Sequence, residues 1–455
     1  MSFIQRITKR LPSAPSLPID DGPREKGRNP SRFAFFRRRI RLKGNSKISE
    51  KHDKVFATGC LPIDQDRIDK EPRANAAFVV LARNKELEGV IQSLKSIERH
   101  FNRWYHYPYV FLNDGDFDEE FRATVKNYTS APVEFGKIDN TMWGFPDWVD
   151  HEVAKEGIRK QGDAAIMYGG MESYHHMCRF YSGHFYKHSL LMKYEWYWRL
   201  EPEINDPFIK MAEANKTYGF TIAVKELRET VPNIFRYAAA YKRKNNLKSK
   251  GLWEMFLERP AEEEKPAEPE KKQEKLPDEI LLTEPGDKNL DDIDPEAMEG
   301  ESYNMCHFWS NFEIARLDWF RSKPYEDFFN MMDRSGGFWN ERWGDAPIHS
   351  LAAGALLSPS DIHYFRDFGY RHTTIQHCPA NAPARQLPRE PYLEKTTEDE
   401  KKRIEEDEYW ATADPVKENG VGCRCRCDTD IVDVEGKQGS CLNEWVEVAG
   451  GWASP

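Results

Sequence analysis

The sequence contains no long apolar segment. Across its 455 residues the longest apolar run is the short stretch from Ala76 to Ala82, whereas a membrane-spanning helix needs about 20 such residues. The N-terminal sequence MSFIQRITKRLPSAPSLPID also lacks the sustained apolar core of a secretory signal peptide. We therefore expect neither a spanning helix nor a signal peptide in this sequence.

The usual cysteine spacing of a zinc site is also absent. Four of the eight cysteines are scattered and four come late in the chain, the first group being Cys60, Cys178, Cys306 and Cys378 and the second Cys423, Cys425, Cys427 and Cys441. The alternating Cys-x-Cys-x-Cys of the second group differs from the Cys-x2-Cys pairs of common zinc sites. Disulfides or free thiols are therefore favoured over bound metal.

Basic residues do not dominate the chain, as they do in many nucleic-acid-binding domains. The formal net charge is -10, with Lys and Arg concentrated in residues 1–44 and Glu and Asp in residues 259–302 and 394–408. We interpret the basic stretch from Phe33 to Leu42 as a solvated arm, the alternative being contact with phosphates or an anionic membrane. Nucleic acid is not an expected partner.

Composition divides the chain into three parts. Residues 1–72 are rich in Pro, Ser and charge without a stable period, which predicts a flexible basic arm or stem. Residues 73–390 hold the dense aromatic and apolar segments of one folded domain, interrupted at 260–300 by an acidic insert that cannot bury a core. Residues 391–455 form a charged C-terminal extension that contains cysteines.

Hydrophobic periodicity predicts alternating strands and helices from residue 75 onward. The continuous apolar run 76–82 is typical of a strand buried on both faces, and apolar residues at helical spacing follow over 87–101. Another strand is predicted at 109–112, a helix near 118–128 and a strand at 133–138. This order favours an α/β fold with a mixed, mostly parallel sheet flanked by helices.

The pattern continues in the middle of the chain. Residues 171–193 are predicted to be helical and 194–200 a strand, followed by a helix over 206–217 and a strand over 218–224. In open sheets of this kind, ligands bind beyond the carboxyl ends of the strands. The polar residues that directly follow the first predicted strands are therefore the first candidates: Arg83, Asn84, Asn113 and Asp114.

Two short patterns contain residue types that bind metals. Glu201-Pro202-Glu203 places carboxylates at a strand end, which suits Mg²⁺ or Mn²⁺, although such a turn is more often a solvated loop. His184 and His188 would share one face of a helix, as in some zinc sites. Without a third ligand nearby, packed or surface histidines are favoured for this second pattern.

Acidic residues beside aromatic ones recur in two later segments. Residues 307–314 (HFWSNFEI) end near Glu313, and residues 336–349 (GGFWNERWGDAPIH) contain Glu341, Arg342 and Asp345. Aromatic rings stack on pyranose C–H surfaces, and carboxylates bind sugar hydroxyls or act at the anomeric carbon. The segments are consistent with a sugar site, and core aromatics flanked by surface charge are the alternative.

From Asn75 to Pro379 the chain resembles the fungal α-1,2-mannosyltransferases, glycosyltransferase family 15. The motifs that carry the resemblance are FVVLARN (78–84), ERHFNRWYHYPYVFLND (98–114), YGG (168–170), SYHHMCRFYSG (173–183), KYEWYWRLEPE (193–203), YGFTI (218–222), NMCHFWSNFEI (304–314) and SGGFWNERWGDAPIHS (335–350). Several of them are ten or more residues long and have a rare aromatic composition, which makes the resemblance specific.

The resemblance implies a GT-A type nucleotide-sugar-binding fold and the transfer of mannose, with retention, from GDP-mannose to a mannose-terminated glycan on glycoproteins. It implies Mn²⁺ as cofactor and a membrane-associated enzyme of the Golgi lumen. Glu201 and His372 match metal-binding positions, and Glu313 matches the candidate nucleophile. Asp345 matches an acidic position near the acceptor, and four residues match polar positions around the nucleotide: Arg83, Tyr174, Arg179 and Arg199.

The sequence departs from the family beside the predicted metal site. Members have a segment with a Cys-Asp-Ile run after this turn, but here only Ile204 and Asn205 separate Glu203 from Asp206-Pro207-Phe208. An inactive homologue that still binds the nucleotide or a mannoside is therefore the alternative to an active enzyme.

Overall fold

The computed structural model describes residues 56, 64–199, 206–258, 298, 300–372, 375–378, 431–434, 437 and 439–451. Several features predicted from the sequence lie outside these residues. They are the basic arm 1–44, the Glu201-Pro202-Glu203 turn and the shortened segment after it, the insert 260–300 apart from two residues near its end, and the cysteines 60, 423, 425 and 427.

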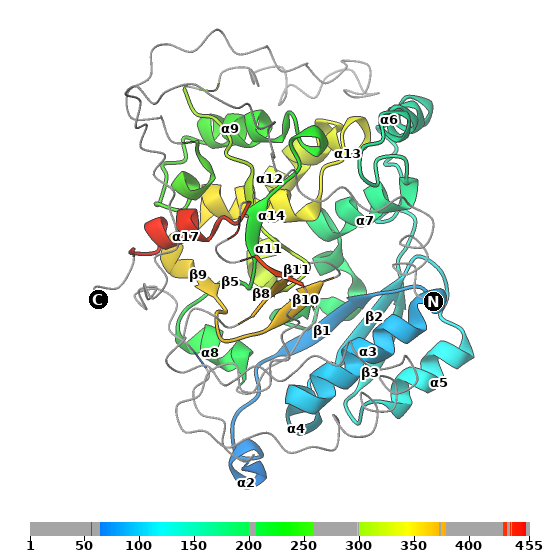
Figure 1. The fold of residues 1–455 in the computed structure, drawn as a ribbon. Coiled ribbons are helices and arrows are strands. Elements are labelled where there is room, and N and C mark those ends of the chain that lie inside the picture. The colour runs from blue at the N-terminus through cyan, green and yellow to red at the C-terminus, as the bar shows by residue number, and fades with distance from the viewer. Residues whose placement is uncertain are drawn as a thin grey trace, which may run out of the picture.

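Short strands alternate with helices along the chain (Figure 1). The strands are β1 (Ala76–Leu81), β2 (Tyr109–Asn113), β3 (Val133–Lys137), β4 (Trp196–Arg199), β5 (Tyr218–Phe220), β6 (Ala223–Lys225), β7 (Cys306–Phe308), β8 (Glu313–Arg316), β9 (Ile362–Tyr364), β10 (Tyr370–His372), β11 (Ile375–His377) and β12 (Val432–Asp433). The helices are α2 (Gln65–Ile68), α3 (Leu87–Ile97), α4 (Arg103–Tyr105), α5 (Glu119–Asn127), α6 (His151–Asp163), α7 (Glu172–Gly183), α8 (Pro207–Glu213), α9 (Ile234–Lys244), α11 (Leu317–Phe320), α12 (Lys323–Arg334), α13 (Gly337–Asn340), α14 (Asp345–Leu356) and α17 (Leu442–Val448).

A seven-stranded sheet in the order β3-β2-β1-β4-β8-β5-β9 forms the centre of the molecule. Neighbouring strands are parallel except at β8, which is antiparallel to both β4 and β5. The predicted α/β fold with a mixed, mostly parallel sheet is therefore confirmed. The first three predicted strands and the helices between them lie within about two residues of their predicted positions, as is usual for element ends.

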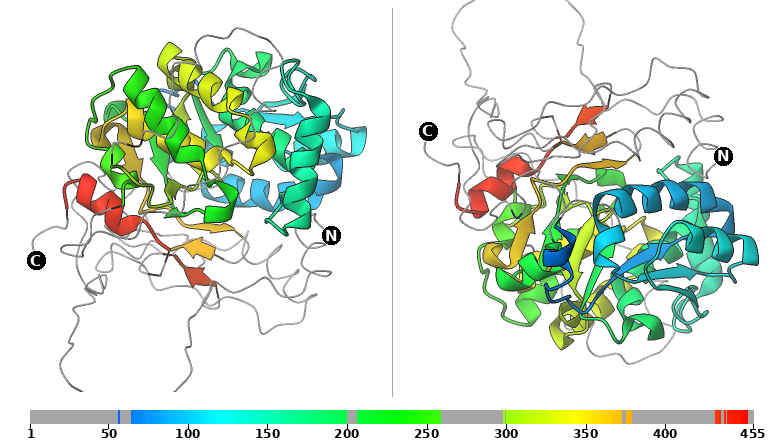
Figure 2. Two further views of the ribbon diagram at one scale, coloured as in Figure 1. Left: turned by 90° about the horizontal axis from the view of Figure 1, so that it is seen from above. Right: turned by 90° about the horizontal axis from the view of Figure 1, so that it is seen from below.

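Helices cover both faces of this sheet (Figure 2). Alternate residues of β1 point to opposite faces, so that Val79 joins the core on the side of α7 and α14 while Phe78 joins the core on the side of α3 and α5. In β2, Val110 and Phe111 divide in the same way. This two-sided burial explains why these strands read as continuous apolar runs in the sequence.

Two elements differ from their sequence predictions. The helix predicted over 171–193 ends at Gly183, and short 3-10 turns follow at Phe185–Lys187 and Ser189–Leu191. His184 and His188 therefore do not share a helical face, and His184 instead packs edge-on against Phe329. The strand predicted over 218–224 is wrong as one strand, because β5 and β6 belong to different sheets.

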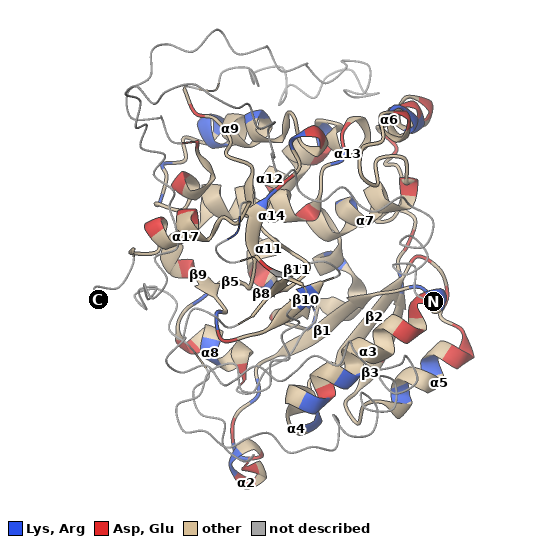
Figure 3. Cartoon of the chain, viewed as in Figure 1, with Lys and Arg blue, Asp and Glu red and all other residues tan. Residues whose placement is uncertain are grey.

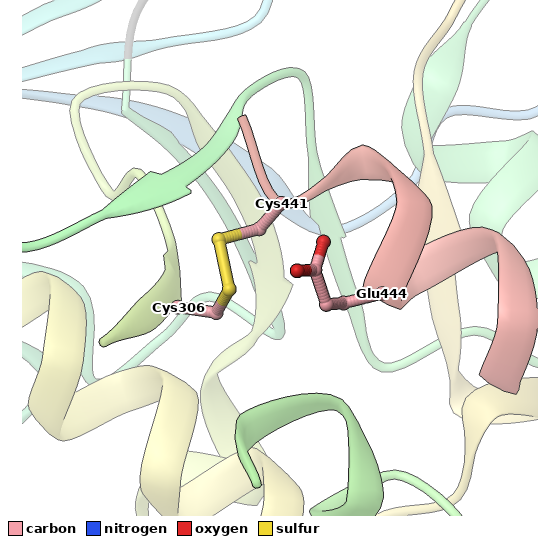
Figure 4. A group of neighbouring side chains, drawn as sticks. All are labelled: Cys306, Cys441 and Glu444. Carbon is pink, nitrogen blue, oxygen red and sulfur yellow. A yellow bond between two sulfur atoms is a disulfide. The ribbon is translucent and has the colours of Figure 1, made fainter. Parts of the chain in front are cut away.

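The end of the C-terminal extension packs onto the folded domain. β12 pairs with β11 in a small sheet of order β10-β11-β12, and Trp445 of α17 is buried against Phe220 and Phe308. A disulfide joins Cys306 and Cys441 (Figure 4). Glu444 lies beside these two sulfurs, but the disulfide occupies them, so this group is not a metal site.

Charged side chains are concentrated on the outer helices, including α5, α6 and α9, whereas the central strands carry few of them (Figure 3). This distribution is expected because an unpaired charge is costly to bury. Among the described residues, no helix combines the length and the apolar composition needed to cross a bilayer.

We predict that Gly183→Ala destabilises the fold. A Cβ atom at this position would lie 2.1 Å from ring atoms of Phe329, a buried aromatic side chain. Overpacking of this kind costs about 1–3 kcal/mol in unfolding free energy, measurable by urea denaturation. Gly115→Ala is the control, because its Cβ would meet nothing closer than 3.7 Å. Equal stability of the two variants would contradict the packing described here.

Candidate functional site

The candidate site lies at the carboxyl ends of β1 and β4. The chain order reverses between these adjacent parallel strands, because β2 and β3 lie beyond β1 while β4 lies on its other side. Such a switch point is the usual ligand site of an open α/β sheet. Arg83 follows β1 and Arg199 ends β4. Because β8 runs antiparallel, its first residue, Glu313, pairs with Arg199 at this same edge.

Glu313 is the most enclosed acidic residue of the site, with 0% of its surface exposed. The Tyr197 hydroxyl donates to its Oε1 and the Tyr218 hydroxyl donates to its Oε2 at 2.7 Å. His349 Nδ1 lies 3.0 Å from the same Oε2. Burial and the nearby Glu313 carboxylate raise the pKa of both tyrosines well above the ordinary value, so both hydroxyls stay protonated as donors.

The contacts of His349 indicate that its ring is protonated. Its Nε2 lies 3.0 Å from the carbonyl oxygen of Tyr181, while Nδ1 faces the Glu313 carboxylate. Both partners are acceptors, so both nitrogens must carry a proton for both bonds to form. Burial alone would lower the pKa of His349, but Glu313, Asp345 and the Tyr181 carbonyl together outweigh it and the pKa is raised. Glu313 and His349 therefore form a buried ion pair.

A second buried ion pair lies beside the first. Arg199 Nη1 is 2.5 Å from Asp345 Oδ2, and the Ser310 hydroxyl donates to the same oxygen at 2.6 Å. The guanidinium also stacks over the Tyr181 ring, with Cζ 3.8 Å from the ring centroid. Burial acts to raise the pKa of Asp345, but Arg199, His349 and Ser310 together outweigh it and the pKa is lowered. Asp345 is the first residue of α14, where a negative charge also interacts favourably with the helix dipole.

The other predicted nucleotide-binding residues lie in separate contacts. Arg179 is held in a bidentate ion pair by Asp333, at 2.7 and 2.8 Å. The hydroxyl of Tyr174 accepts a hydrogen bond from Arg342 at 3.3 Å, and its ring stacks on Tyr168.

Arg83 lies close to the start of α3. It pairs with Glu86 at 2.5 Å and is about one third exposed. The structure therefore brings Arg199, Asp345 and Glu313 into one cluster, whereas the closest polar contacts of Arg83, Tyr174 and Arg179 lie elsewhere.

His372 ends β10 and packs edge-on against Trp309, with ring centroids 5.0 Å apart. Burial lowers its pKa, and the positive charge of Arg199 lowers it further, which places His372 within electrostatic reach of the cluster. A neutral imidazole and a carboxylate make a donor set that a divalent ion accepts. The metal role of His372 stays a prediction, because its predicted partner Glu201 lies outside the described residues.

The sequence interpretation did not single out the partners of Glu313. Tyr197 lies two residues before Arg199 on β4, so the strand period places both on one face. His349 is four residues after Asp345 on α14, the spacing of neighbours on a helix. These two spacings could have predicted Tyr197 and His349 as neighbours of the site once the strand and the helix were known. No spacing of this kind points to Tyr218.

Glu341 and Arg342 also occupy buried positions, but they face other partners. Asn233 and Trp343 donate hydrogen bonds to the Glu341 carboxylate, and burial raises its pKa to about 7. Arg342 pairs with Glu226 at 3.2 Å, which the sequence did not predict. Glu341 thus holds the loop before α14 against the start of α9.

Acids, guanidinium groups and tyrosines gather at the switch point of this mixed α/β sheet, where open sheets of this kind bind their ligands. The comparisons with known proteins give the class, which is that of glycosyltransferases. The chain belongs to the family described as glycolipid 2-alpha-mannosyltransferase, which matches residues 37–389. The resemblance inferred from the motifs is therefore confirmed.

Relatives and solved structures agree with this assignment. The chain is 45% identical over 411 residues to the O-glycoside alpha-1,2-mannosyltransferase homolog 4 of Schizosaccharomyces pombe, covering 89% of this chain and 84% of that protein. Core-mannan synthase A (CmsA/Ktr4) of Aspergillus fumigatus, solved in a Mn/GDP form, superimposes with a TM-score of 0.56 at 33% identity, over 73% of this chain and 81% of the other. The mannosyltransferase Ktr4p of S. cerevisiae in complex with GDP gives a TM-score of 0.57 at 33% identity, over 72% and 78% of the two chains.

We predict that Asp333→Asn weakens the fold strongly, because it leaves the Arg179 guanidinium charged and unpaired. Only 4% and 7% of the two side chains are exposed, and breaking such a pair costs about 3–5 kcal/mol in unfolding free energy. Asp116→Asn breaks an exposed pair with Lys137 and should cost at most about 1 kcal/mol. If Asp333→Asn unfolds in urea like the wild type but loses GDP affinity, Arg179 serves the nucleotide and not the fold.

A pH-dependent loss of stability should trace to His349. Because its pKa is raised in the folded state above the ordinary 6.5, its contribution is complete below pH 6.5 and is lost as the pH rises through the folded value. The stability difference between wild type and His349→Gln should therefore shrink with rising pH.

His184→Gln is the matched control for this titration. Burial lowers the pKa of His184 to about 3, so its ring is neutral in both states and the difference should stay constant from about pH 7.5 to 9. A difference for His349→Gln that is equally constant would exclude the protonated ring inferred above.

Proposed function

We propose that the chain is a retaining α-1,2-mannosyltransferase that moves mannose from GDP-mannose to the 2-hydroxyl of an α-mannoside on glycoproteins. The observation that carries the proposal is the buried cluster of Arg199, Asp345, Glu313 and His349 at the switch point of the sheet. Membership of the mannosyltransferase family supports it, and the neighbouring structures solved with GDP support a nucleotide-sugar donor.

Departure of GDP requires stabilisation of the negative charge that develops on the diphosphate. Glu201 and His372 would hold a Mn²⁺ ion, which supplies Lewis-acid stabilisation of that charge when bound. Arg83 and Arg199, at the ends of β1 and β4, are proposed to donate hydrogen bonds to the diphosphate. Tyr174 and Arg179 are proposed to line the part of the site that binds the nucleotide. The ion pair with Asp333 holds the Arg179 guanidinium in place.

Asp345 is proposed to orient the acceptor hydroxyl. Its Oδ2 accepts from Arg199 and Ser310, which fixes the carboxylate at the start of α14. Burial alone would favour the neutral acid, but Arg199, His349 and Ser310 together outweigh it, and the lowered pKa of Asp345 keeps the carboxylate ionised. A fixed and ionised carboxylate is suited to accept a hydrogen bond from a sugar hydroxyl and to hold it near the anomeric carbon.

Retention of configuration allows two roles for Glu313. In a double displacement its carboxylate attacks the anomeric carbon, whereas in a same-face transfer it only organises the site. Both oxygens are engaged by donors, the side chain is wholly enclosed, and an imidazolium neutralises its charge. These features weaken a nucleophile, so we propose the second role, while nucleophilic attack stays the prediction drawn from family resemblance.

The disulfide between Cys306 and Cys441 supports an oxidising compartment, because such bonds are rare in the cytosol. We therefore propose that the enzyme acts in the lumen of the Golgi, associated with the membrane.

The transfer assay uses GDP-mannose, Mn²⁺ and methyl-α-mannoside, with and without a chelator. We expect an α-1,2-linked disaccharide that disappears when the chelator is added. GDP binding without product would instead favour an inactive homologue, and absence of GDP binding would overturn both readings.

Glu313→Gln separates the two roles of the carboxylate. If Glu313 organises the site, the variant loses transfer and also about 1–3 kcal/mol of stability, because buried donors lose their acceptor. Transfer is measured in the same assay and stability by urea denaturation. Loss of transfer with wild-type stability and wild-type GDP affinity would contradict the organising role proposed for Glu313.

A further inference from the structure

The C-terminal element, defined here as residues 431–434 and 439–449, lies beyond the residues that match the family, which end at 389. It reaches the strand that carries His372 through one intervening strand. Val432 pairs with Ile375 of β11, and Ile375 pairs with His372 of β10. The red β12 lies beside the orange β11 in Figures 1 and 2.

Hydrogen bonds fasten this added strand at both of its ends. The backbone N–H of Val434 donates to the carbonyl of Gln376 at 2.9 Å. The Gln376 side chain, itself buried, donates to the carbonyl of Ile431 at 3.1 Å. A two-stranded hairpin of short strands is marginally stable on its own, and a third strand makes it a sheet. β12 is therefore the strand that completes the support of β10.

The same element is tied to the strand that leads into the acidic cluster. Cys441 forms the disulfide with Cys306 of β7, and Ser310 and Glu313 follow shortly after β7 in the chain. The backbone N–H of Cys441 also donates to Ala223 of β6, the partner strand of β7. This crosslink joins residues 135 positions apart, so it removes much of the freedom of the C-terminal segment.

Aromatic packing connects these two attachments. Trp309, between β7 and β8, lies edge-on to both Tyr370 and His372 of β10. Val434 of the C-terminal element belongs to the same buried cluster as Tyr370 and Phe312. One face of β10 is therefore packed against Trp309, and its hydrogen-bonded edge is supported through β11 by the C-terminal element.

We propose that the C-terminal element is a positioning element for the metal site, which fixes the orientation of His372 through β12 and the Cys306–Cys441 disulfide. The proposal rests on the proposed function, in which His372 holds Mn²⁺. In this proposal the element acts on metal affinity through the geometry of β10. Groups that orient a metal-binding histidine commonly change metal affinity by about 10-fold to 100-fold when they are removed.

The test measures Mn²⁺ binding to the full chain by electron paramagnetic resonance, with and without GDP. Two variants weaken the element at different points: Cys441→Ser removes the disulfide, and Gln376→Leu removes the side-chain bond to Ile431. Both should raise the Mn²⁺ dissociation constant about 10-fold at a temperature where each protein remains folded by circular dichroism.

Val125→Ala is the matched control. It truncates a buried side chain of α5, in the core beside β2 and β3 at the opposite end of the sheet. It should lower the melting temperature while leaving the Mn²⁺ dissociation constant unchanged. Lower melting temperatures with wild-type Mn²⁺ affinity in both Cys441→Ser and Gln376→Leu would overturn the proposal, because the element would then be purely structural.

Failure of the positioning proposal can be distinguished from failure of the proposed function. If the wild type binds Mn²⁺ and GDP but transfers no mannose, the proposed function fails, whereas the affinity comparison among the variants still decides the role of the element. If the wild type binds no Mn²⁺ with or without GDP, the positioning proposal is overturned, and the chelator-sensitive transfer assay decides the function separately.

Discussion

Four buried charges that neutralise one another organise this molecule. Glu313 with His349 and Arg199 with Asp345 form two ion pairs, brought together from β4, β8 and α14. A buried charge is tolerated only when it is paired and hydrogen-bonded, and a missing partner leaves an uncompensated charge. The requirement therefore fixes the positions of the three elements relative to one another. The same charges lie at the carboxyl edge of the sheet. The pairing of buried charges that the fold requires therefore also places the residues of the candidate site.

The reversed direction of β8 makes this arrangement possible. A parallel strand would place its first residue at the opposite edge, whereas the antiparallel β8 begins beside the end of β4, where Glu313 pairs with Arg199. Tyr197 and Tyr218 reach Glu313 from the strands on either side of β8. Helix α14 then covers this face and brings Asp345 and His349 from successive turns. The core on the other face, with Phe78 and Phe111, packs the strands against α3 and α5.

Local patterns predicted the first half of the fold well, because β1 and β2 are buried on both faces and therefore read as uninterrupted apolar runs. They failed at 218–224, where the chain passes from one sheet to another within a continuous β-rich segment. The local patterns also predicted a helix that continues past Gly183, whereas α7 ends there. Phe329, which is distant in the sequence, packs against Gly183 at this point. For the site, the motifs identified Arg199, Asp345 and Glu313, but not the residues that contact Glu313.

The contacts of Glu313 with Tyr197 and Tyr218 join residues 116 and 95 positions apart, and no local pattern encodes them. The pairing of Cys306 with Cys441 is likewise a property of the folded chain, since cysteine spacing allows many connectivities.

The central claim is that the enclosed Glu313 carboxylate organises a same-face transfer without forming a bond to the sugar. The most direct test is intact-protein mass spectrometry after incubation with Mn²⁺ and a GDP-mannose analogue that carries fluorine at C2, which slows the breakdown of any glycosyl-enzyme. With methyl-α-mannoside present as acceptor, our account predicts an unmodified protein mass while GDP is released and the fluorinated sugar is transferred to the acceptor. A mass increase of one fluorinated hexosyl group, located by peptide mapping on Glu313, would contradict it.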